Sequence, residues 1–151
     1  MYLQPMIVQM ATEKDIPKLI PALIELRPHR SPEEIHRMIL HQFNEGYQLI
    51  YIGDEDMAYA AAGFRTLHFL FSGKTLYIDD LVTHSAHRRK GYSAMLMKWI
   101  KKYVAENGYD HLSLDSGFQR KDAHRLYLNE GLELASFHFA RSAGELASLK
   151  K

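Results

Sequence analysis

The sequence predicts an α+β (α/β) domain in which one mixed central β-sheet is flanked by helices on both faces. Three observations support this fold class. Segments with strand character and segments with helical spacing of apolar residues alternate along the chain of 151 residues. In the middle of the chain, two short turns join three strand-like segments into an antiparallel meander. A strand, a helix and another strand then follow in order, and such a crossover unit makes its two strands parallel.

The N-terminal part of the chain is predicted to form one strand and two helices. Residues 6–10 are a short apolar run and give the first strand. Apolar residues at helical spacing predict a helix over residues 16–26, which Pro21 should kink or shift. The second helix is predicted over residues 32–44. Its N-cap is Ser31, which is followed by proline and, at the third helical position, by glutamate.

The three strands of the meander come next. Residues 47–52 and 57–70 favour strands and flank a turn at residues 53–56. A second turn at residues 72–74 leads into a strand over residues 75–83. Because short turns join them, consecutive strands are expected to pair antiparallel.

The second half of the chain completes the crossover. A helix is predicted over residues 91–106 and ends at an asparagine–glycine pair. A strand at residues 111–114 and a helix over residues 121–130 follow. Alternating apolar residues then predict a final strand over residues 132–141, which leaves residues 142–151 as a polar tail.

Length and composition indicate one globular domain spanning residues 1–151. Apolar residues make up 46% of the chain and charged residues 25%, which is ordinary for a soluble protein. The formal net charge of +1 creates no global positive field, so a nucleic-acid partner is not expected. No apolar run approaches the length of a membrane span, and the N-terminus lacks the features of a signal peptide. We therefore expect a cytoplasmic protein with no membrane partner.

Metal and thiol chemistry find little support in the sequence. The chain contains no cysteine, which excludes a disulfide scaffold, thiol catalysis and thiolate metal sites. His84 and His87 lie three residues apart, but they fall in a predicted loop without a third ligand, so no metal site is expected. The aromatic residues of the predicted strands are interpreted as core, not as a stacking platform for nucleic acid.

A basic loop joins the strand predicted at residues 75–83 to the helix that follows it. Arg88, Arg89 and Lys90 precede Gly91, directly before the helix begins. A helix N-terminus offers unpaired N–H groups, glycine lets a ligand approach the backbone, and the cations attract anions. These features suit a phosphorylated ligand. A solvated basic turn, in which glycine serves only the chain geometry, is the alternative interpretation.

Three segments resemble parts of the GNAT family of N-acetyltransferases. RRKGYS at residues 88–93 is similar to the family's R-x-x-G-x-G/A signature, with Ser93 in place of the usual final Gly or Ala. DDLVT at residues 79–83 resembles the family's fourth strand. Downstream, AHRLYLNEGL at residues 123–132 is similar to the A-x-x-F/L-Y-x-x-x-G-F/L segment. The resemblance spans the whole chain, although the first half is similar mainly in its order of elements.

The resemblance implies a GNAT-like acyl-CoA N-acyltransferase fold and acetyl-CoA as the cosubstrate. It implies that the backbone edge of the fourth strand pairs with the pantetheine arm and that one N–H polarises the thioester carbonyl. It also implies that the basic loop binds the CoA pyrophosphate. The residues implied to bind acetyl-CoA are Leu81, Val82, Thr83, Arg88, Arg89, Lys90, Gly91, Tyr92 and Ser93.

Acetyl transfer to an amine also requires a base. A lysine-like amine has a pKa of about 10.4, so reaching its neutral form at pH 7 costs about 4–5 kcal/mol. Asp79 and Asp80 are the candidates, and strand alternation predicts that they face opposite sides. The resemblance implies that Asp79 occupies the family's base position. The sequence leaves open whether the base is Asp79, Asp80 or a water chain, and a structural role remains the alternative for either aspartate.

Tyr127 is the candidate acid. The resemblance implies that it lies beside the acetyl-CoA sulfur, and the small residue Ala123 on the same helical face leaves room for a ligand. A phenol with a pKa of about 10 is protonated at neutral pH and can donate to the departing thiolate. A core aromatic is the alternative interpretation.

The sequence is therefore identified as an acetyl-CoA-dependent N-acetyltransferase acting on a primary amine, with a small molecule as the expected acceptor. Residues 122–127 and 136–139 also resemble the aminoalkylphosphonate acetyltransferase branch, but the acceptor stays open. A catalytically silent CoA-binding or regulatory domain and a protein N-terminal or lysine acetyltransferase are the alternatives. A nucleotide-phosphate enzyme is disfavoured, because no G-x-x-x-x-G-K-[ST] pattern is present. A homodimer is compatible with the sequence.

Overall fold

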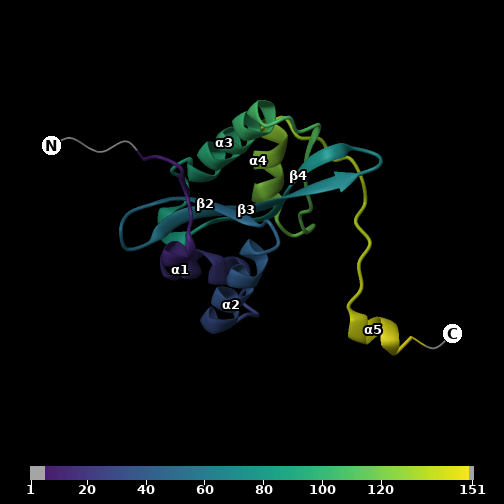
Figure 1. Ribbon diagram of the computed structural model, residues 1–151, viewed down its shortest axis with the longest axis horizontal. Helices are drawn as coiled ribbons and strands as arrows, with labels where there is room; N and C mark the ends of the chain where they lie inside the picture. Colours follow the sequence, from purple (N-terminus) through teal and green to yellow (C-terminus); the bar gives the residue numbers. More distant parts are fainter. Residues whose placement is uncertain (1–5, 150–151) are drawn as a thin grey trace.

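A five-stranded sheet forms the middle layer of the computed structural model, which describes residues 6–149 (Figure 1). The strands, in spatial order, are β1 (Gln9–Met10), β2 (Gln48–Gly53), β3 (Ala58–Phe69), β4 (Gly73–Thr83) and β5 (His111–Leu114). Neighbours from β1 to β4 pair antiparallel, whereas β4 and β5 pair in parallel. The predicted mixed sheet, with its meander and its crossover, is confirmed.

Helices cover both faces of this sheet. They are α1 (Ile16–Leu26), α2 (Pro32–Phe43), α3 (Tyr92–Glu106) and α4 (Lys121–Asn129), with a short α5 (Ala143–Ala147) and the 3-10 turns η1 (Glu13–Asp15) and η2 (Ser85–His87). Figure 1 shows α1 and α2 on one face and α3 and α4 on the other. Alternate residues of β2 divide between the two cores. Leu49 and Tyr51 pack on the side of α1 and α2, whereas Ile50 and Ile52 pack on the side of α3.

The first two helices begin and end close to their predicted limits. Ser31 caps α2 as predicted, because its Oγ accepts a hydrogen bond from the backbone N–H of Glu34 at 3.1 Å. Pro21, which was predicted to kink or shift this helix, lies inside α1, and the helix continues through it to Leu26. Proline removes one helical donor, but Leu19 and Leu23 on either side of it are buried in the core. We infer that their packing outweighs the lost hydrogen bond.

The prediction of a final strand over residues 132–141 is wrong. Within the described residues, this segment is not paired with the sheet. We call residues 132–142 the C-terminal arm. Figure 1 shows that the arm runs away from the body and that α5 stands off at its end. Three apolar side chains of the arm are strongly exposed, Leu134 by 90%, Phe137 by 79% and Phe139 by 91%. Alternation shows which residues share a face, but it does not supply a neighbouring strand.

The two ends of the chain differ from prediction in smaller ways. Of the strand predicted at residues 6–10, only Gln9 and Met10 pair with β2. The short helix α5 lies within the predicted polar tail, whose last residues, Lys150 and Lys151, fall outside the described part. Between residues 6 and 149, no helix combines the length and the apolar character needed to cross a bilayer.

Candidate active site

The strands β4 and β5 separate halfway along β4. Their parallel ladder ends at the pair Ile78 and Leu114, whereas β4 itself continues to Thr83. In the described structure, this last stretch of β4 has a strand neighbour on the β3 side only. Its other edge therefore carries backbone N–H and C=O groups with no sheet partner. Leu81 and Val82, which were predicted to bind the cosubstrate through their backbone, lie on this stretch.

A β-bulge in β4 brings both candidate aspartates to the same side of the sheet. Asp80 pairs with Gly63 and Ile78 pairs with Phe64, so Asp79 is an extra residue without a partner on β3. Ile78 packs in the core under α3. After the extra residue, the contacts of both carboxylates lie on the side of α1 and α2. The prediction that Asp79 and Asp80 face opposite sides is wrong, because simple alternation does not reveal a bulge.

Asp80 is held in a network of hydrogen bonds. Arg27, the residue that follows α1, donates to Asp80 Oδ1 from Nε at 3.2 Å and from Nη2 at 2.9 Å. The buried Tyr47 hydroxyl donates to Asp80 Oδ2 at 2.6 Å. Burial, followed by the charge of Asp80, raises the pKa of Tyr47 well above its usual value, so the phenol stays a donor. Both Asp80 oxygens are thus occupied, and the residue ties the end of α1 to β4.

Asp79 has a different environment. The guanidinium of Arg65 on β3 contacts both of its oxygens, with Nε at 3.0 Å from Oδ1 and 2.9 Å from Oδ2. Burial raises the pKa of Asp79, although Arg65 opposes this rise. Asp79 is therefore more basic than an ordinary aspartate. It also lines the cleft beside β4, whereas Asp80 does not.

This cleft brings together residues that lie far apart in the sequence. Its volume is about 120 Å³, and it opens where β4 and β5 part. Asp79 and Leu81 contribute to it from β4, Leu114 from the end of β5, and Ala123 and Tyr127 from α4. The structure thus places the candidate base Asp79 and the candidate acid Tyr127 in one cleft, with the unpaired edge of β4 beside them.

Tyr127 is suited to donate a proton into the cleft. Within the described residues, its hydroxyl has no hydrogen-bond partner. Burial raises the pKa of Tyr127, so the phenol is protonated throughout the neutral range. Arg120 lines the same cleft just before α4, and its charge partly opposes this rise. No ion pair to Arg120 is found within residues 6–149.

The predicted phosphate loop is open to solvent at the start of α3. Gly91 is the N-cap and has a φ of 81°, and Arg89 also has a positive φ of 62°. Apart from the adjoining residues and the helix backbone, no atom lies within 4 Å of the point that a Gly91 Cβ would occupy. The hydroxyls of Thr83 and Ser93 lie 2.6 Å apart and join β4 to α3. The loop's three cations are exposed, so the space before this helix suits an anionic group.

Glu25 and Tyr59, which the sequence did not single out, contact the segment between β4 and α3 from other elements. Glu25 of α1 accepts a hydrogen bond from the Ser85 N–H at 2.7 Å. His87 stacks on Tyr59 of β3, with ring centroids 3.9 Å apart. Burial lowers the pKa of His87, which favours the neutral ring. The described residues contain no cluster of three His, Asp or Glu side chains suited to a metal ion.

The partners of the two aspartates were also missed from sequence. A signal existed for Arg65, because a lone charge in a strand of small and apolar residues implies an acidic partner when it is buried. Arg27 lay in a predicted loop, and Tyr47 was interpreted as an ordinary core aromatic. Neither of these two residues carries a local pattern that points to Asp80.

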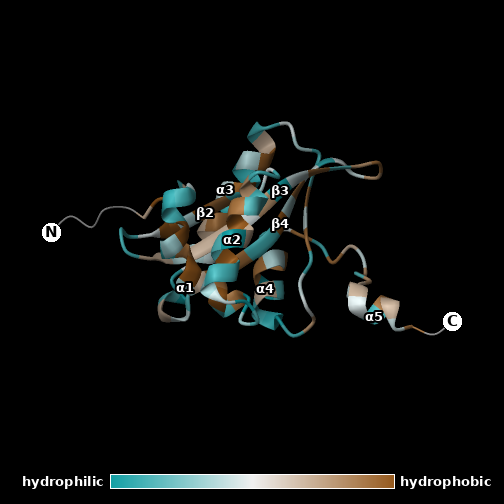
Figure 2. Ribbon diagram, turned by 60° about the horizontal axis from the view of Figure 1, so that its bottom comes forward, coloured by the Kyte–Doolittle hydropathy of each residue, from teal (hydrophilic) through white to brown (hydrophobic). Residues whose placement is uncertain are grey.

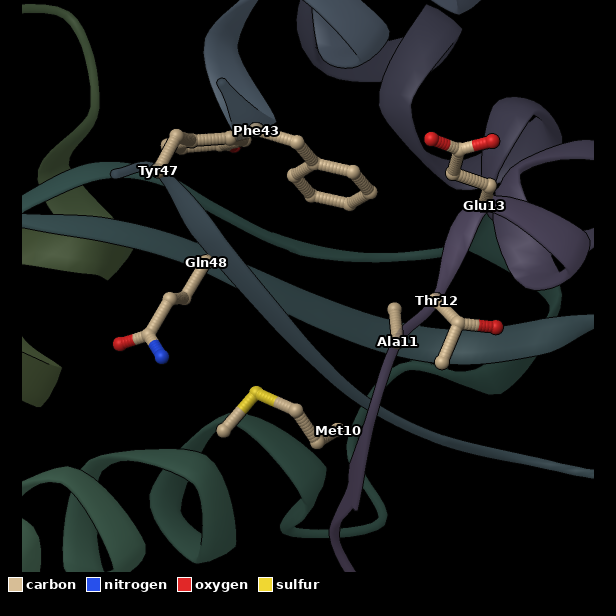
Figure 3. A pocket seen from close by; sticks show the side chains of 7 residues that line it. All are labelled: Met10, Ala11, Thr12, Glu13, Phe43, Tyr47 and Gln48. Atoms are coloured by element: carbon tan, nitrogen blue, oxygen red, sulfur yellow. The ribbon is translucent and has the colours of Figure 1, made fainter. Parts of the chain in front are cut away.

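A second and larger hollow lies on another part of the molecule. It has a volume of about 300 Å³, and its walls include Met10, Glu13, Phe43 and Tyr47 (Figure 3). The hydroxyl of Tyr47 is already bonded to Asp80. Because this hollow contains neither the free strand edge nor a predicted acid or base, we assign the candidate site to the cleft beside β4.

Comparisons with known proteins bear on the family and the fold of this chain. A model of the acetyltransferase (GNAT) family matches residues 16–131. An uncharacterized N-acetyltransferase of Bacillus subtilis (strain 168) is 30% identical over 135 residues, which are 88% of this chain and 95% of that protein. The aminoalkylphosphonate N-acetyltransferase of Salmonella typhimurium is 29% identical over 65 residues, which are 43% of this chain and 42% of that protein. An aminoglycoside N-acetyltransferase solved with CoA superposes with a TM-score of 0.79 at 10% identity, over 92% of this chain and 95% of that one.

Proposed function

The chain belongs to the GNAT family of acetyl-CoA-dependent N-acetyltransferases, and from this premise we propose that it acetylates the primary amine of a small molecule that also carries an acidic group. The observation that carries the proposal is the cleft in which the free edge of β4, Asp79 and Tyr127 meet. A bound thioester there has a strand edge to pair with, a carboxylate on the amine side and a phenol on the sulfur side.

The cosubstrate is proposed to lie along the free edge of β4 with its phosphates at the start of α3. The amide groups of the pantetheine arm would pair with backbone groups beside Leu81 and Val82. The pyrophosphate would face the N–H groups of the α3 N-terminus and the exposed cations of the preceding loop. This placement is supported by the open space in front of Gly91 and by the absence of a strand on that edge of β4 in the described structure.

In the proposed reaction, the neutral amine attacks the thioester carbonyl carbon. A carbon–nitrogen bond forms, the carbon–sulfur bond breaks and the amine loses a proton. Asp79 receives this proton directly or through water, which its raised pKa favours. The thiolate leaves with the proton of Tyr127, and the phenol is restored from solvent. Asp80 takes no proton in this scheme, because Asp79 lines the cleft and Asp80 does not.

An acidic group on the acceptor is supported by the charges of the cleft. Arg27 and Arg120 both line it, and Arg27 is already paired with Asp80. Arg120 is the cleft arginine without an ion pair in the described part of the chain. A guanidinium binds a carboxylate, phosphonate or phosphate through two parallel hydrogen bonds. The relative from Salmonella typhimurium is named for an acceptor of this kind, an aminoalkylphosphonate.

The proposal is tested by measuring thiol release from acetyl-CoA with matched acceptors. Each acidic amine, such as an aminoalkylphosphonate, is compared with the alkylamine of the same length that lacks the acidic group. We expect the acidic member to be preferred at least about tenfold in kcat/KM, and Arg120→Gln to remove this preference while acetyl-CoA affinity is retained. Mass spectrometry should find the acetyl group on the amine.

Three outcomes would overturn the proposal. Equal rates for both members of each pair would remove the acidic group from the acceptor class. A preference for peptides with a free N-terminus or lysine would assign the site to protein acetylation. CoA binding without turnover of any amine would mark the chain as a silent CoA-binding domain.

A further inference from the structure

Arg65 is a charged side chain in the middle of a largely apolar strand. It lies on β3, directly after Phe64, which is fully buried in the core under α3. Figure 2 shows β3 and β4 as mostly apolar strands that hydrophilic segments interrupt. The side chain of Arg65 is only 23% exposed, and that of its partner Asp79 only 18%. Charges so far removed from water are costly unless they are paired, so each of these residues depends on the other.

The guanidinium of Arg65 meets the carboxylate of Asp79 through two of its nitrogen atoms. Nε lies 3.0 Å from Oδ1 and 2.9 Å from Oδ2, and Nη2 also donates to Oδ2. A contact of this kind fixes the orientation of a carboxylate as well as its charge. A carboxylate has about four lone-pair sites, and within the described residues Oδ1 accepts from Nε alone. Asp79 can therefore be held by Arg65 and still accept a proton in the cleft.

The bulge in β4 gives this contact its importance. Asp79 is the extra residue of the bulge, so no residue of β3 stands opposite it and the ladder does not set the direction of its side chain. Arg65 itself stands opposite Tyr77, two residues before Asp79, and its long side chain reaches along the sheet to the bulge. In the described structure, Arg65 is the only side chain that forms a hydrogen bond with this carboxylate.

Arg65 is in turn held by Tyr47. Its guanidinium carbon lies 5.5 Å from the centre of the Tyr47 ring, which is a cation–π contact. The ring is buried, and its hydroxyl is bonded to Asp80. It also lies against Gly63 of β3, where a Cβ would overlap the Tyr47 hydroxyl. Glycine at this position leaves room for the ring, and the fixed ring offers Arg65 a fixed face.

We propose that Arg65 is a positioning residue for acetyl transfer: it fixes the carboxylate of Asp79 at the bulge and keeps it ionised at neutral pH, ready to take the proton of the acceptor amine. This inference rests on the proposed function, in which Asp79 is the base. Arg65 does not line the cleft, so it acts through Asp79 and not on the acceptor. A partly buried aspartate without such a partner would become protonated at a higher pH and could then accept no proton.

The surroundings of Asp79 disfavour its charge unless Arg65 is present. Burial raises the pKa of Asp79 most, and the charge of Asp80 adds to this rise, whereas Arg65 and then Arg27 lower the pKa. Arg27 is already paired with Asp80. Loss of Arg65 should therefore raise the pKa of Asp79 further. The other charged or titratable groups near this carboxylate or in the same cleft are Tyr47, Tyr77, Asp115, Arg120 and Tyr127.

The pH–rate profile of amine acetylation tests the proposal. The limb that belongs to Asp79 is identified by its loss in Asp79→Asn. In Arg65→Gln we expect this limb to move up by at least about one pH unit, since an adjacent opposite charge lowers a carboxyl pKa by about 1–3. The plateau rate should fall at least about tenfold, because the carboxylate is no longer held in one orientation. Arg65→Lys keeps the charge without the fork of donors, so it should lower the plateau and leave the limb near its wild-type position.

Two control variants separate this role from a structural one. Tyr47→Phe removes the donor to Asp80 but keeps the ring beside Arg65, so it should lower the melting temperature and leave the limb in place. Arg125→Gln removes the same charge from an exposed position on α4 and should change neither quantity. An unmoved limb in Arg65→Gln, or an equal movement in Tyr47→Phe, would overturn the proposal.

A measurement that needs no turnover keeps this inference separate from the proposed function. The carboxyl carbon of Asp79, isotope-labelled and assigned by its absence in Asp79→Asn, is titrated by NMR in the wild type and in Arg65→Gln. We expect the titration midpoint to rise by at least about one pH unit in the variant. If the midpoint rises but no amine is acetylated, the proposed function fails while the control of Asp79 by Arg65 is supported. An unchanged midpoint would refute the role of Arg65 even in an active enzyme.

Discussion

Tyr127→Phe removes one hydroxyl from the cleft and leaves the aromatic ring in place. Because the hydroxyl has no hydrogen-bond partner within the described residues, its loss breaks no bond that holds the fold. The ring packs against the core under α3 and is retained in the variant. We therefore expect the free energy of unfolding to change by less than about 0.5 kcal/mol, as for a substitution away from any stabilising contact.

The loss of rate is expected at or below the lower end of the usual range for acid catalysis, which is about 10²–10⁴-fold. Burial raises the pKa of Tyr127 above its ordinary value of about 10, whereas a free thiol has a pKa of about 8.5. Proton transfer from the phenol to a fully formed thiolate is thus uphill by at least about 2 kcal/mol. The phenol can help only while the carbon–sulfur bond is breaking. We therefore expect a loss of about 10–100-fold, or about 1.4–2.7 kcal/mol of transition-state stabilisation.

The assay is the initial rate of thiol release, with acetyl-CoA affinity and the melting temperature measured in parallel. Because the phenol stays protonated up to at least pH 10, the ratio of wild-type to variant rates should be constant between pH 7 and pH 9. Tyr109→Phe is the control, since this tyrosine lies outside the cleft and should retain full turnover. Full turnover in Tyr127→Phe would leave this residue as packing and assign the proton to water. Loss of acetyl-CoA binding in the same variant would show that the hydroxyl binds instead of donating.

Three other substitutions separate the roles of neighbouring residues. Gly91→Glu should abolish thermal stabilisation by CoA. Gly91→Ala carries the same left-handed backbone strain without a charge and should retain most of this stabilisation. Equal CoA affinity in both variants would exclude this loop from CoA binding. Asp79→Asn should lower turnover more than Asp80→Asn does. It should also remove the ascending limb of the pH–rate profile, which the raised pKa of Asp79 places above the pH range of an ordinary aspartate. The reverse order of the rates would make Asp80 the base. Asp80→Asn should instead destabilise the fold more than Asp79→Asn does, by about 1–3 kcal/mol in the free energy of unfolding, because Arg27 and buried Tyr47 lose their charged acceptor. An unchanged melting temperature would contradict the structural role of Asp80.

The sequence predicted elements whose signal is local. The start of α3 follows from a glycine placed before a helical face, and Ser31 caps α2 for reasons contained within four residues. The meeting of Asp79 and Tyr127 followed from the family resemblance, which supplied the long-range contact. The bulge at Asp79 could not be foreseen, because it is a mismatch between two strands and neither strand shows it alone.

The prediction of the final strand failed for a related reason. Alternation along the C-terminal arm is real, and the structure shows it as an extended segment. A strand, however, is defined by its neighbour, and no neighbour within the described residues pairs with this segment. Local pattern therefore predicted the conformation of the arm but not its pairing.

The early end of the β4–β5 ladder also has a consequence for hydrogen exchange. Backbone amides on the open edge of β4 have only solvent as a partner when the cleft is empty, so they should exchange quickly even though β4 is not an edge strand of the sheet. An occupant that pairs with this edge would act as a missing strand. At one hundred times its dissociation constant it would add about 2.7 kcal/mol to the free energy of unfolding. Protection confined to these amides would then locate the cosubstrate without any substitution in the chain.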